Sequence, residues 1–182
     1  MEEFIERLAG ARIGETFNFY RDGPGAVTRR SRLLAYLHSR KEAPLLLVGE
    51  AAGYRGARVS GIPFTSERQL TGAGPAEATA TIMHRALAEL GIEEEVLLWN
   101  VVPTHPGTET SNRRPTRAEV EAGLPFLREL ARNRRVIAVG RLAHFVLGDP
   151  YVRHPSHGGA SAFGADLRAS LSNQAPPSGV NT

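Results

Sequence analysis

The chain has 182 residues, of which 41% are hydrophobic and 23% charged, and its formal net charge is +3. This is an ordinary globular composition with enough apolar side chains for a sizeable core, and so mild a positive charge does not identify a polyanionic partner. The chain contains no cysteine, which excludes disulfides, thiolate zinc sites and iron–sulfur clusters. No apolar run approaches the roughly 18–20 residues that cross a bilayer. Because the start MEEFIERLAG is also unlike a secretory signal, we expect a cytoplasmic protein without membrane contact.

The first half of the chain alternates helical and strand patterns. Apolar residues recur at helical spacing in three segments, the N-terminus, residues 26–41 and residues 76–90. Between the last two lies PLLLVG (44–49), a short continuous apolar run ending in glycine. Such a run is typical of a strand that is buried on both faces.

The alternation continues in the second half. We expect, in order, a strand at 95–102 (EVLLWNVV), a helix from 116 to about 133, a strand at 135–140, a helix over LAHFVL, a short strand at 150–154 (PYVRH) and a helix at 161–171. The first of these could also be two half-strands around Asn100. The helix from 116 opens with a capping box, in which Thr116 caps the helix and Glu119 reaches back.

Strands that alternate with helices predict an α/β fold with a parallel sheet and helices on both faces. We expect a single domain over residues 1–171 and a flexible tail over residues 172–182. Ligands of such sheets bind outside the carboxyl ends of the strands. Polar side chains gather at these ends: Glu50, Asn100 with His105, and the HPS that begins at His154.

Two side chains stand out in LLLVGEAAGYRGARVSGIPFTSE (45–67). Glu50 directly follows the apolar run, and it is either a solvated acid or a carboxylate beside a ligand. Gly49 and the following AAG keep the backbone free of bulk, although the stretch is not a phosphate-binding loop of the GxxxxGK(S/T) type. Phe64 follows a proline among polar residues. It is either a core plug or a stacking platform for a flat ring, and base stacking is worth about 1–3 kcal/mol.

Two further candidates lie at later strands. Asn100 interrupts an aliphatic strand, and a buried amide is costly unless its hydrogen bonds are met. It is therefore either a satisfied structural residue or a donor and acceptor for a planar ligand edge. In HPS (154–156) the proline restrains His154 to an extended backbone, and Ser156 offers a hydroxyl and an amide. This histidine, too, is either structural or functional.

The remaining histidines and arginines are candidates for metal and phosphate binding. His105 and His157 raise a metal alternative, but their spacing to carboxylates matches no known metal signature, so we expect no metal. Arginine suits bidentate phosphate contacts better than lysine does. Arginines recur in the expected loops, at Arg55, Arg58, Arg68, Arg113, Arg114, Arg141 and Arg153.

The sequence resembles the uracil-DNA glycosylase superfamily. Three motifs occur in the family's order: GEAAG after the first strand, WNVVP on the second and HPS after the fourth. GIPFTSE, NRRPT and AVGRLA are similar as well. The chain resembles most the branch whose first motif reads glycine, glutamate, small residue, proline, glycine.

The chain departs from this pattern in two ways. The branch commonly carries four cysteines around an iron–sulfur cluster, and none is present here. Ala52 replaces the usual proline of the first motif, and Ala51 stands where another branch has an aspartate. Glu50 is therefore the only carboxylate in this motif.

The resemblance implies a three-layer α/β/α sandwich around a four-stranded parallel sheet. It implies a monomeric DNA repair enzyme that flips uracil out of DNA and hydrolyses its N-glycosidic bond, releasing free uracil. Phe64 would stack on the flipped base, and Asn100 would read its edge. His154 would donate to the base carbonyl between the sugar bond and the ring nitrogen. Glu50, with backbone around Ala51, would position or activate water, and no metal or organic cofactor would be required.

DNA contacts and base range follow from the same resemblance. The DNA backbone would be held by Arg55, Arg58, Ser66, Arg113, Arg114, Ser156 and His157. Relatives that exclude thymine place a bulky ring where Gly53 stands, so thymine is excluded only if Tyr54 reaches over the base. Gly158 and Gly159 in HPSHGGAS cannot wedge the duplex, which predicts a preference for single-stranded or mismatched sites.

Three other interpretations stay open. Ala51 and Ala52 make a DNA-binding relative without turnover credible. A nucleotide or nucleoside hydrolase could use a similar sheet. A glycosylase could instead act on hypoxanthine, xanthine or mismatched thymine.

Overall fold

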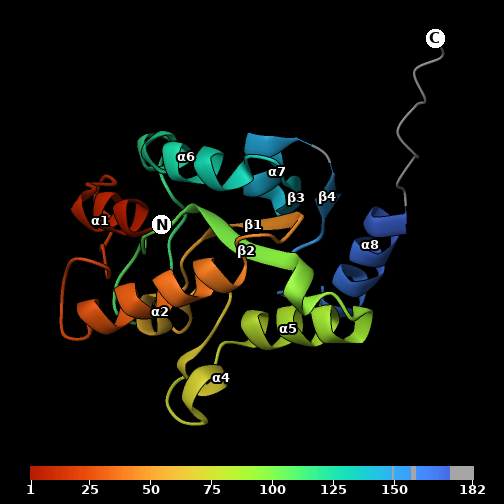
Figure 1. Cartoon of the computed structure of the whole chain (residues 1–182), viewed down its shortest axis with the longest axis horizontal. Helices are drawn as coiled ribbons and strands as arrows, with labels where there is room; N and C mark the ends of the chain where they lie inside the picture. Colours follow the sequence, from red (N-terminus) through yellow and green to blue (C-terminus); the bar gives the residue numbers. More distant parts are fainter. Residues whose placement is uncertain (149, 157–158, 173–182) are drawn as a thin grey trace.

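Four parallel strands form one sheet in the computed structural model, which describes residues 1–148, 150–156 and 159–172. The strand order is β2-β1-β3-β4 (Figure 1). The strands are β1 (Leu45–Ala51), β2 (Val96–Val102), β3 (Arg135–Val139) and β4 (Tyr151–Val152). The predicted fold class, an α/β sandwich around a four-stranded parallel sheet, is confirmed.

The helices that surround the sheet follow the expected order. They are α1 (Glu2–Gly10), α2 (Ala26–Ser39), α3 (Ala57–Ser60), α4 (Glu67–Thr71), α5 (Ala78–Leu90), α6 (Arg117–Ala131), α7 (Arg141–Leu147) and α8 (Ala160–Ser172), with a 3₁₀ turn at Glu93–Glu95. The short helices α3 and α4 were not expected, because α3 is a single turn between Gly56 and Gly61 and α4 has only five residues between Ser66 and Gly72. In the described part of the chain, no helix has the length and apolarity to cross a membrane.

The strand boundaries differ from the sequence expectation in two places. β1 runs on to Ala51, so Glu50 belongs to the strand rather than to the loop after it. β4 has only two residues, since it pairs with β3 through Tyr151 and Val152 alone. β2 is one continuous strand through Asn100, and all seven of its residues are buried. Ser172 lies in α8, and the rest of the predicted tail lies outside the described residues.

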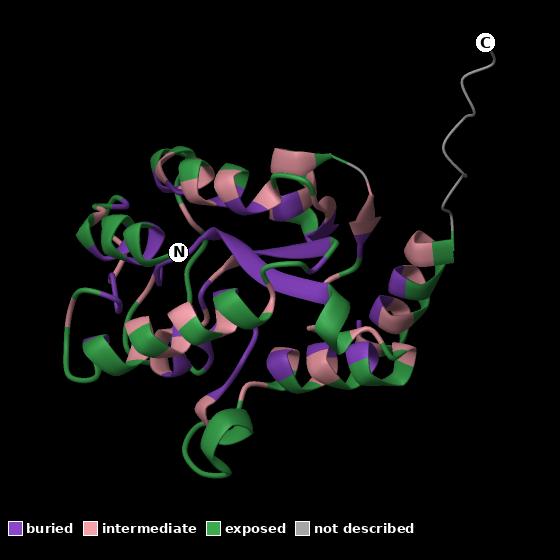
Figure 2. Ribbon diagram, in the orientation of Figure 1, coloured by how far each residue is buried: buried purple, intermediate pink, exposed green. Residues whose placement is uncertain are grey.

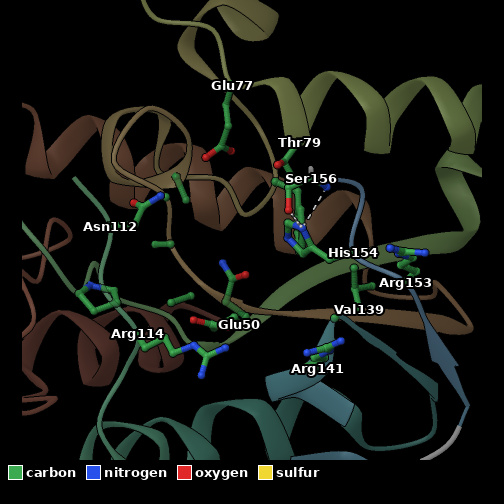
Figure 3. A pocket seen from close by; sticks show the side chains of 18 of the residues that line it. Glu50, Glu77, Thr79, Asn112, Arg114, Val139, Arg141, Arg153, His154 and Ser156 are labelled. Carbon is green, nitrogen blue, oxygen red and sulfur yellow. Dashed lines mark hydrogen bonds between the residues drawn. The ribbon is translucent and has the colours of Figure 1, made fainter. Parts of the chain in front are cut away.

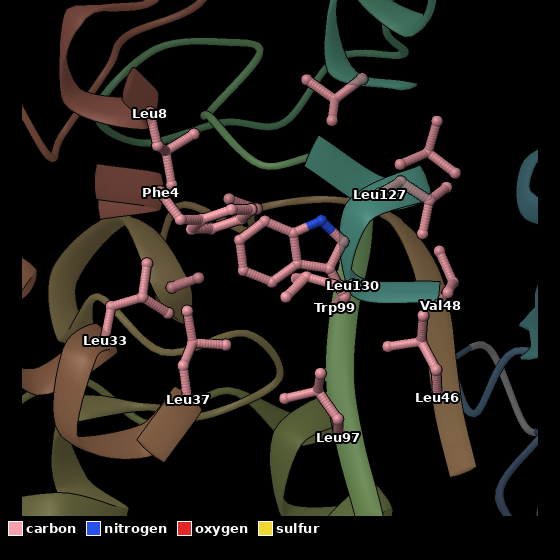
Figure 4. Close-up of a cluster of buried hydrophobic side chains, with 14 of the residues drawn as sticks. Phe4, Leu8, Leu33, Leu37, Leu46, Val48, Leu97, Trp99, Leu127 and Leu130 are labelled. Atoms are coloured by element: carbon pink, nitrogen blue, oxygen red, sulfur yellow. The ribbon is translucent and has the colours of Figure 1, made fainter. Parts of the chain in front are cut away.

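The core lies on both faces of the sheet, as Figure 2 shows by the purple strands between the helices. Alternate residues of β1 point to opposite faces. Leu46 and Val48 join a cluster formed with α1, α2, α6 and α7, in which Trp99 packs edge-on to Phe4 (Figure 4). Leu45 and Leu47 join a second cluster with α5 and α8. Burial on both faces holds the carboxyl ends of the strands in fixed positions.

Candidate active site

A cavity of about 950 Å³ opens at the carboxyl ends of β1, β2 and β3, where parallel sheets bind their ligands. The expected site residues that line it are Glu50, Ala51, Gly53, Phe64, Asn100, Arg113, Arg114, His154 and Ser156. These residues are far apart in the chain, and the cavity brings them together (Figure 3).

Glu50 lies near the end of β1, half-buried in the cavity wall. Burial raises the pKa of its carboxyl group, and the positive charge of Arg114 acts in the opposite direction. Figure 3 shows the Arg114 guanidinium beside Glu50. Arg114 thus offsets part of the cost of burying the ionised Glu50 carboxylate at this end of the cavity.

Phe64 lies against the backbone of Gly49. A Cβ atom added to Gly49 would overlap the Phe64 ring and would lie 3.0 Å from Oδ1 of Asn100. Glycine is therefore required at this position for the ring to lie over the strand end. The ring is 7% exposed and lines the cavity, so it is neither wholly interior nor a free surface group.

The backbone of Phe64 has φ +52°, which is a genuine outlier for a bulky residue. Neighbouring hydrogen bonds hold it there: the Ser60 hydroxyl donates to the Thr65 carbonyl at 2.6 Å, and Tyr20 donates to the Gly61 carbonyl at 2.9 Å. Strained conformations of this kind persist where the surroundings over-determine them, and they cluster at ligand sites. The loop thus fixes the orientation of the ring.

Asn100 pairs with Gly49 in the β1–β2 register, which places its side chain next to Phe64. The residue is 4% exposed and lines the cavity. No described residue forms a hydrogen bond with its amide group, so Asn100 is not a structurally satisfied asparagine. Its amide therefore keeps one donor group and one acceptor available in the cavity, where a ligand with matching polar groups can pair with it.

The HPS segment fixes the tautomer of His154. The backbone amide of Ser156 donates to Nδ1 of His154 at 3.2 Å, and the Ser156 hydroxyl lies 2.8 Å from the same atom. A nitrogen that accepts an amide N–H carries no proton, so we assign the proton of the neutral ring to Nε2. His154 also packs against Gly140 at the end of β3, where a side chain would crowd it.

Arg113 and Arg114 have different surroundings although they are adjacent. Arg113 forms a bidentate pair with Glu119 at 2.6 and 2.8 Å, and Glu119 also accepts from the amides of Thr116 and Glu15. The hydrogen bonds from Arg113 lower the pKa of Glu119 to about 2. Glu119 is 1% exposed, so this pair anchors the NRRPT segment to α6 and leaves Arg114 directed at Glu50.

Glu77 lines the cavity and was not expected from the sequence. It is the N-cap residue of α5, but its side chain makes no capping hydrogen bond. A Cβ atom added to Gly53 or to Gly56 would collide with its carboxylate, which therefore lies against the backbone of the first motif. Burial raises the pKa of Glu77, and no described residue forms a hydrogen bond or ion pair with its carboxylate.

Four described residues that were predicted as contacts do not line the cavity: Tyr54, Arg55, Arg58 and Ser66. Tyr54 contributes its backbone, whose amide donates to Oδ1 of Asn112 at 3.0 Å, and its ring packs beneath the Arg55 guanidinium. Arg58 pairs with Glu109 at 2.9 Å. Phosphate contacts by Arg55 and Arg58 stay predictions, and they would lie outside the cavity rather than in it.

The expected phosphate contact of Ser66 requires a correction. Ser66 is fully buried, and both its amide and its hydroxyl donate to Oε1 of Gln69 in the capping box of α4. A side chain without accessible surface cannot reach a DNA backbone. His157 lies outside the described residues.

Further polar residues line the cavity without having been singled out as contacts. They are Glu77, Thr79, Asn112, Arg141, Arg153 and Asp166. Arg141 and Arg153 are exposed, and neither side chain forms an ion pair within the described residues. Their positions directly after β3 and β4 were the available signal, because parallel strands deliver such residues to one edge.

The metal alternative does not fit the geometry of His105. This residue is fully buried, and its two ring nitrogens lie 2.7 Å from the Ala52 carbonyl and 2.8 Å from the Thr108 carbonyl. Neither nitrogen can therefore face a metal ion. Within the described ranges, no three His, Cys, Asp or Glu side chains group together as metal ligands.

Comparison with known proteins agrees with this geometry. A type-4 uracil-DNA glycosylase from Pyrobaculum aerophilum is 33% identical over 103 residues, which are 54% of this chain and 45% of that protein. The chain thus matches less than half of that relative's length. The crystal structure of wild-type SMUG2 from Pedobacter heparinus superposes with a TM-score of 0.65 at 14% identity, covering 95% of this chain and 98% of that one, and so shares the fold. A sequence model of the uracil DNA glycosylase superfamily matches residues 37–176, which include the whole cavity, and the chain therefore belongs to that superfamily.

Proposed function

We propose that the chain is a monofunctional DNA glycosylase that removes uracil from DNA and leaves an abasic site. The observation that carries the proposal is the convergence of Glu50, Phe64, Asn100 and His154 on one cavity. The type-4 uracil-DNA glycosylase relative supports the choice of uracil.

The base would enter the cavity as a flipped nucleotide, because chemistry on a base requires its removal from the stack at a cost of a few kcal/mol. Phe64 would stack on its face and recover about 1–3 kcal/mol. The amide of Asn100 would donate to the O4 carbonyl and accept from N3–H of uracil. Cytosine presents an amine and a bare nitrogen at these positions, so a held amide rejects it.

Bond cleavage places the bonding electron pair on the base and positive charge on the sugar. His154, with its proton on Nε2, would donate to the O2 atom where the negative charge develops. A donor aimed at such an oxyanion is typically worth about 3–4 kcal/mol. The carboxylate of Glu50 would stabilise the sugar cation and orient water, whose oxygen bonds to the anomeric carbon. The proton that this water loses would pass through Glu50 to the departing uracil anion, so that the products are neutral uracil and an abasic sugar.

The rim of the cavity carries guanidinium groups that would hold the DNA backbone. Arg114, Arg141 and Arg153 line it, and Ser156 adds a hydroxyl and an amide. Arg113 is held by Glu119, so its contribution to phosphate binding would be indirect.

The test is a product gel with oligonucleotides that contain one uracil, in single strands and opposite guanine or adenine, with chelator present and alkali to reveal abasic sites. We expect cleavage that Glu50→Ala and His154→Ala each reduce by roughly 100-fold or more, with unchanged melting temperatures. Binding without cleavage would favour a DNA-binding relative, and release from hypoxanthine but not uracil would change the base. Cleavage of free deoxyuridine would favour a nucleoside hydrolase.

A further inference from the structure

The carboxylate of Glu77 occupies the space beside Gly53, a residue that has no side chain of its own to fill it. Any side chain at Gly53 or Gly56 would collide with this carboxylate. Two glycines of one loop thus make room for one acid from the start of another element, α5. The arrangement fills the wall of the cavity that follows Glu50 and Ala51 along the chain.

The energetics of this placement point to a role in the cavity. The Glu77 carboxylate is partly buried, and no described residue forms a hydrogen bond or an ion pair with it. It also forgoes the capping bond that an acid at its position could make to α5. An acid that loses hydration without a partner lowers stability, and such groups gather at functional sites.

Glu77 would face the edge of a bound base that His154 and Asn100 leave uncontacted. This step rests on the proposed function. With O2 at His154 and the N3–O4 edge at Asn100, the edge that remains carries C5 and lies beyond O4. The first-motif loop begins beside Asn100 at Gly49, and Glu77 lies against the same loop at Gly53 and Gly56. Glu77 is on the side of the cavity opposite Glu50 and Arg114 (Figure 3).

We propose that Glu77 closes the base slot beside Gly53 and so excludes pyrimidines with a substituent at C5. The carboxylate takes the place of the side chain that Gly53 lacks. It acts by occupying volume, and it does not contact the reacting atoms. Uracil, with hydrogen at C5, fits in front of it, and thymine does not.

The experiment compares excision of uracil, thymine and 5-bromouracil, each opposite guanine, by the wild type, Glu77→Ala and Glu77→Gln. Bromine matches a methyl group in size but makes the base a better leaving group, so it separates exclusion by size from slow chemistry. The matched control is Glu89→Ala, which changes an exposed acid on the same helix. Melting temperatures show whether each variant is folded.

We expect the wild type to remove uracil and to reject both larger bases. One methyl group in a pocket is worth roughly 10–200-fold, so Glu77→Ala should lose selectivity against thymine and 5-bromouracil by at least about 10-fold and keep uracil excision. Glu77→Gln keeps the volume and should keep the selectivity, as should Glu89→Ala.

Several outcomes would overturn the proposal. The first is equal excision of thymine and uracil by the wild type. The second and third concern a folded Glu77→Ala: an unchanged ratio of uracil excision to thymine excision, or the loss of uracil excision. The fourth is a loss of selectivity in Glu77→Gln as large as in Glu77→Ala, which would assign the effect to charge. A wild type that releases no base from any oligonucleotide contradicts the proposed function itself, and is thereby distinguished from these four.

Discussion

The ring of Phe64 lies so close to the Cα atom of Gly49 that no side chain fits between them. The strand end and the loop that carries the ring are therefore matched to each other. The loop holds the backbone of Phe64 at a positive φ, so the position from which the ring extends is set by the hydrogen bonds of this loop.

This contact predicts the effect of Gly49→Ala. The added methyl group should push the ring off the strand end and remove most of its stacking on the base, which is worth about 1–3 kcal/mol and corresponds to a roughly 5- to 150-fold lower kcat/KM. Steady-state kinetics on a uracil oligonucleotide measure this. Gly10→Ala, where the added group meets open space, is the control and should retain full activity.

The unpartnered amide predicts that Asn100→Ala separates function from stability. Two lost hydrogen bonds to the base, about 1–3 kcal/mol together, should lower kcat/KM by roughly 5- to 150-fold. The melting temperature should not fall, because no described residue bonds to this amide in the free protein. A large drop in melting temperature with unchanged kinetics would show that Asn100 is structural after all.

The position of Arg114 beside Glu50 predicts that Arg114→Ala changes the pH dependence of kcat/KM. Its charge opposes the effect of burial on the pKa of Glu50, so Arg114→Ala should raise that pKa further. In the proposed mechanism the ionised carboxylate is the active form, so the acid limb of the kcat/KM profile should move to higher pH. Arg117→Ala, which removes an exposed guanidinium on α6, should leave the position of this limb unchanged. A profile of Arg114→Ala that coincides with the wild type would contradict the assignment.

The ion pair between Arg113 and Glu119 predicts that Arg113→Ala lowers the free energy of unfolding. Its removal leaves the buried carboxylate of Glu119 without its strongest partner, at a cost of about 1–3 kcal/mol. The lowered pKa of Glu119 means that its stabilising contribution is complete above pH 4.5 and is lost as the pH falls toward about 2. Denaturant unfolding should therefore show a large deficit for Arg113→Ala at pH 7 that narrows as the pH falls through this range.

The sequence was sufficient to locate β1, β2 and β3, because each is a short apolar run, but it did not show that β4 pairs with β3 at only two positions. It was also sufficient for the cap of α6, where Thr116 and Glu119 form the predicted capping box. The sequence could not show that Glu119 also binds Arg113, because the capping box alone accounts for an acid at position 119.

Glu77 illustrates what the sequence could not predict about the site. An acid before a helix is expected to interact with the free amides of the first turn. Its contact with Gly53 and Gly56 depends on how α5 packs against the first-motif loop, which is a tertiary relationship. Ser66 was misassigned for the reverse reason, since its own local cap uses the hydroxyl that was expected to bind DNA.

The two-residue length of β4 divides the cavity into halves of unequal rigidity. Glu50 and Asn100 extend from β1 and β2, which share six paired positions, whereas His154 follows a strand paired at two. Local opening requires the least free energy where the fewest backbone bonds are broken, so amide protons around His154 should exchange with solvent sooner than those around Asn100. We therefore expect the side of the cavity that carries the imidazole to open locally more readily than the side that carries the amide of Asn100.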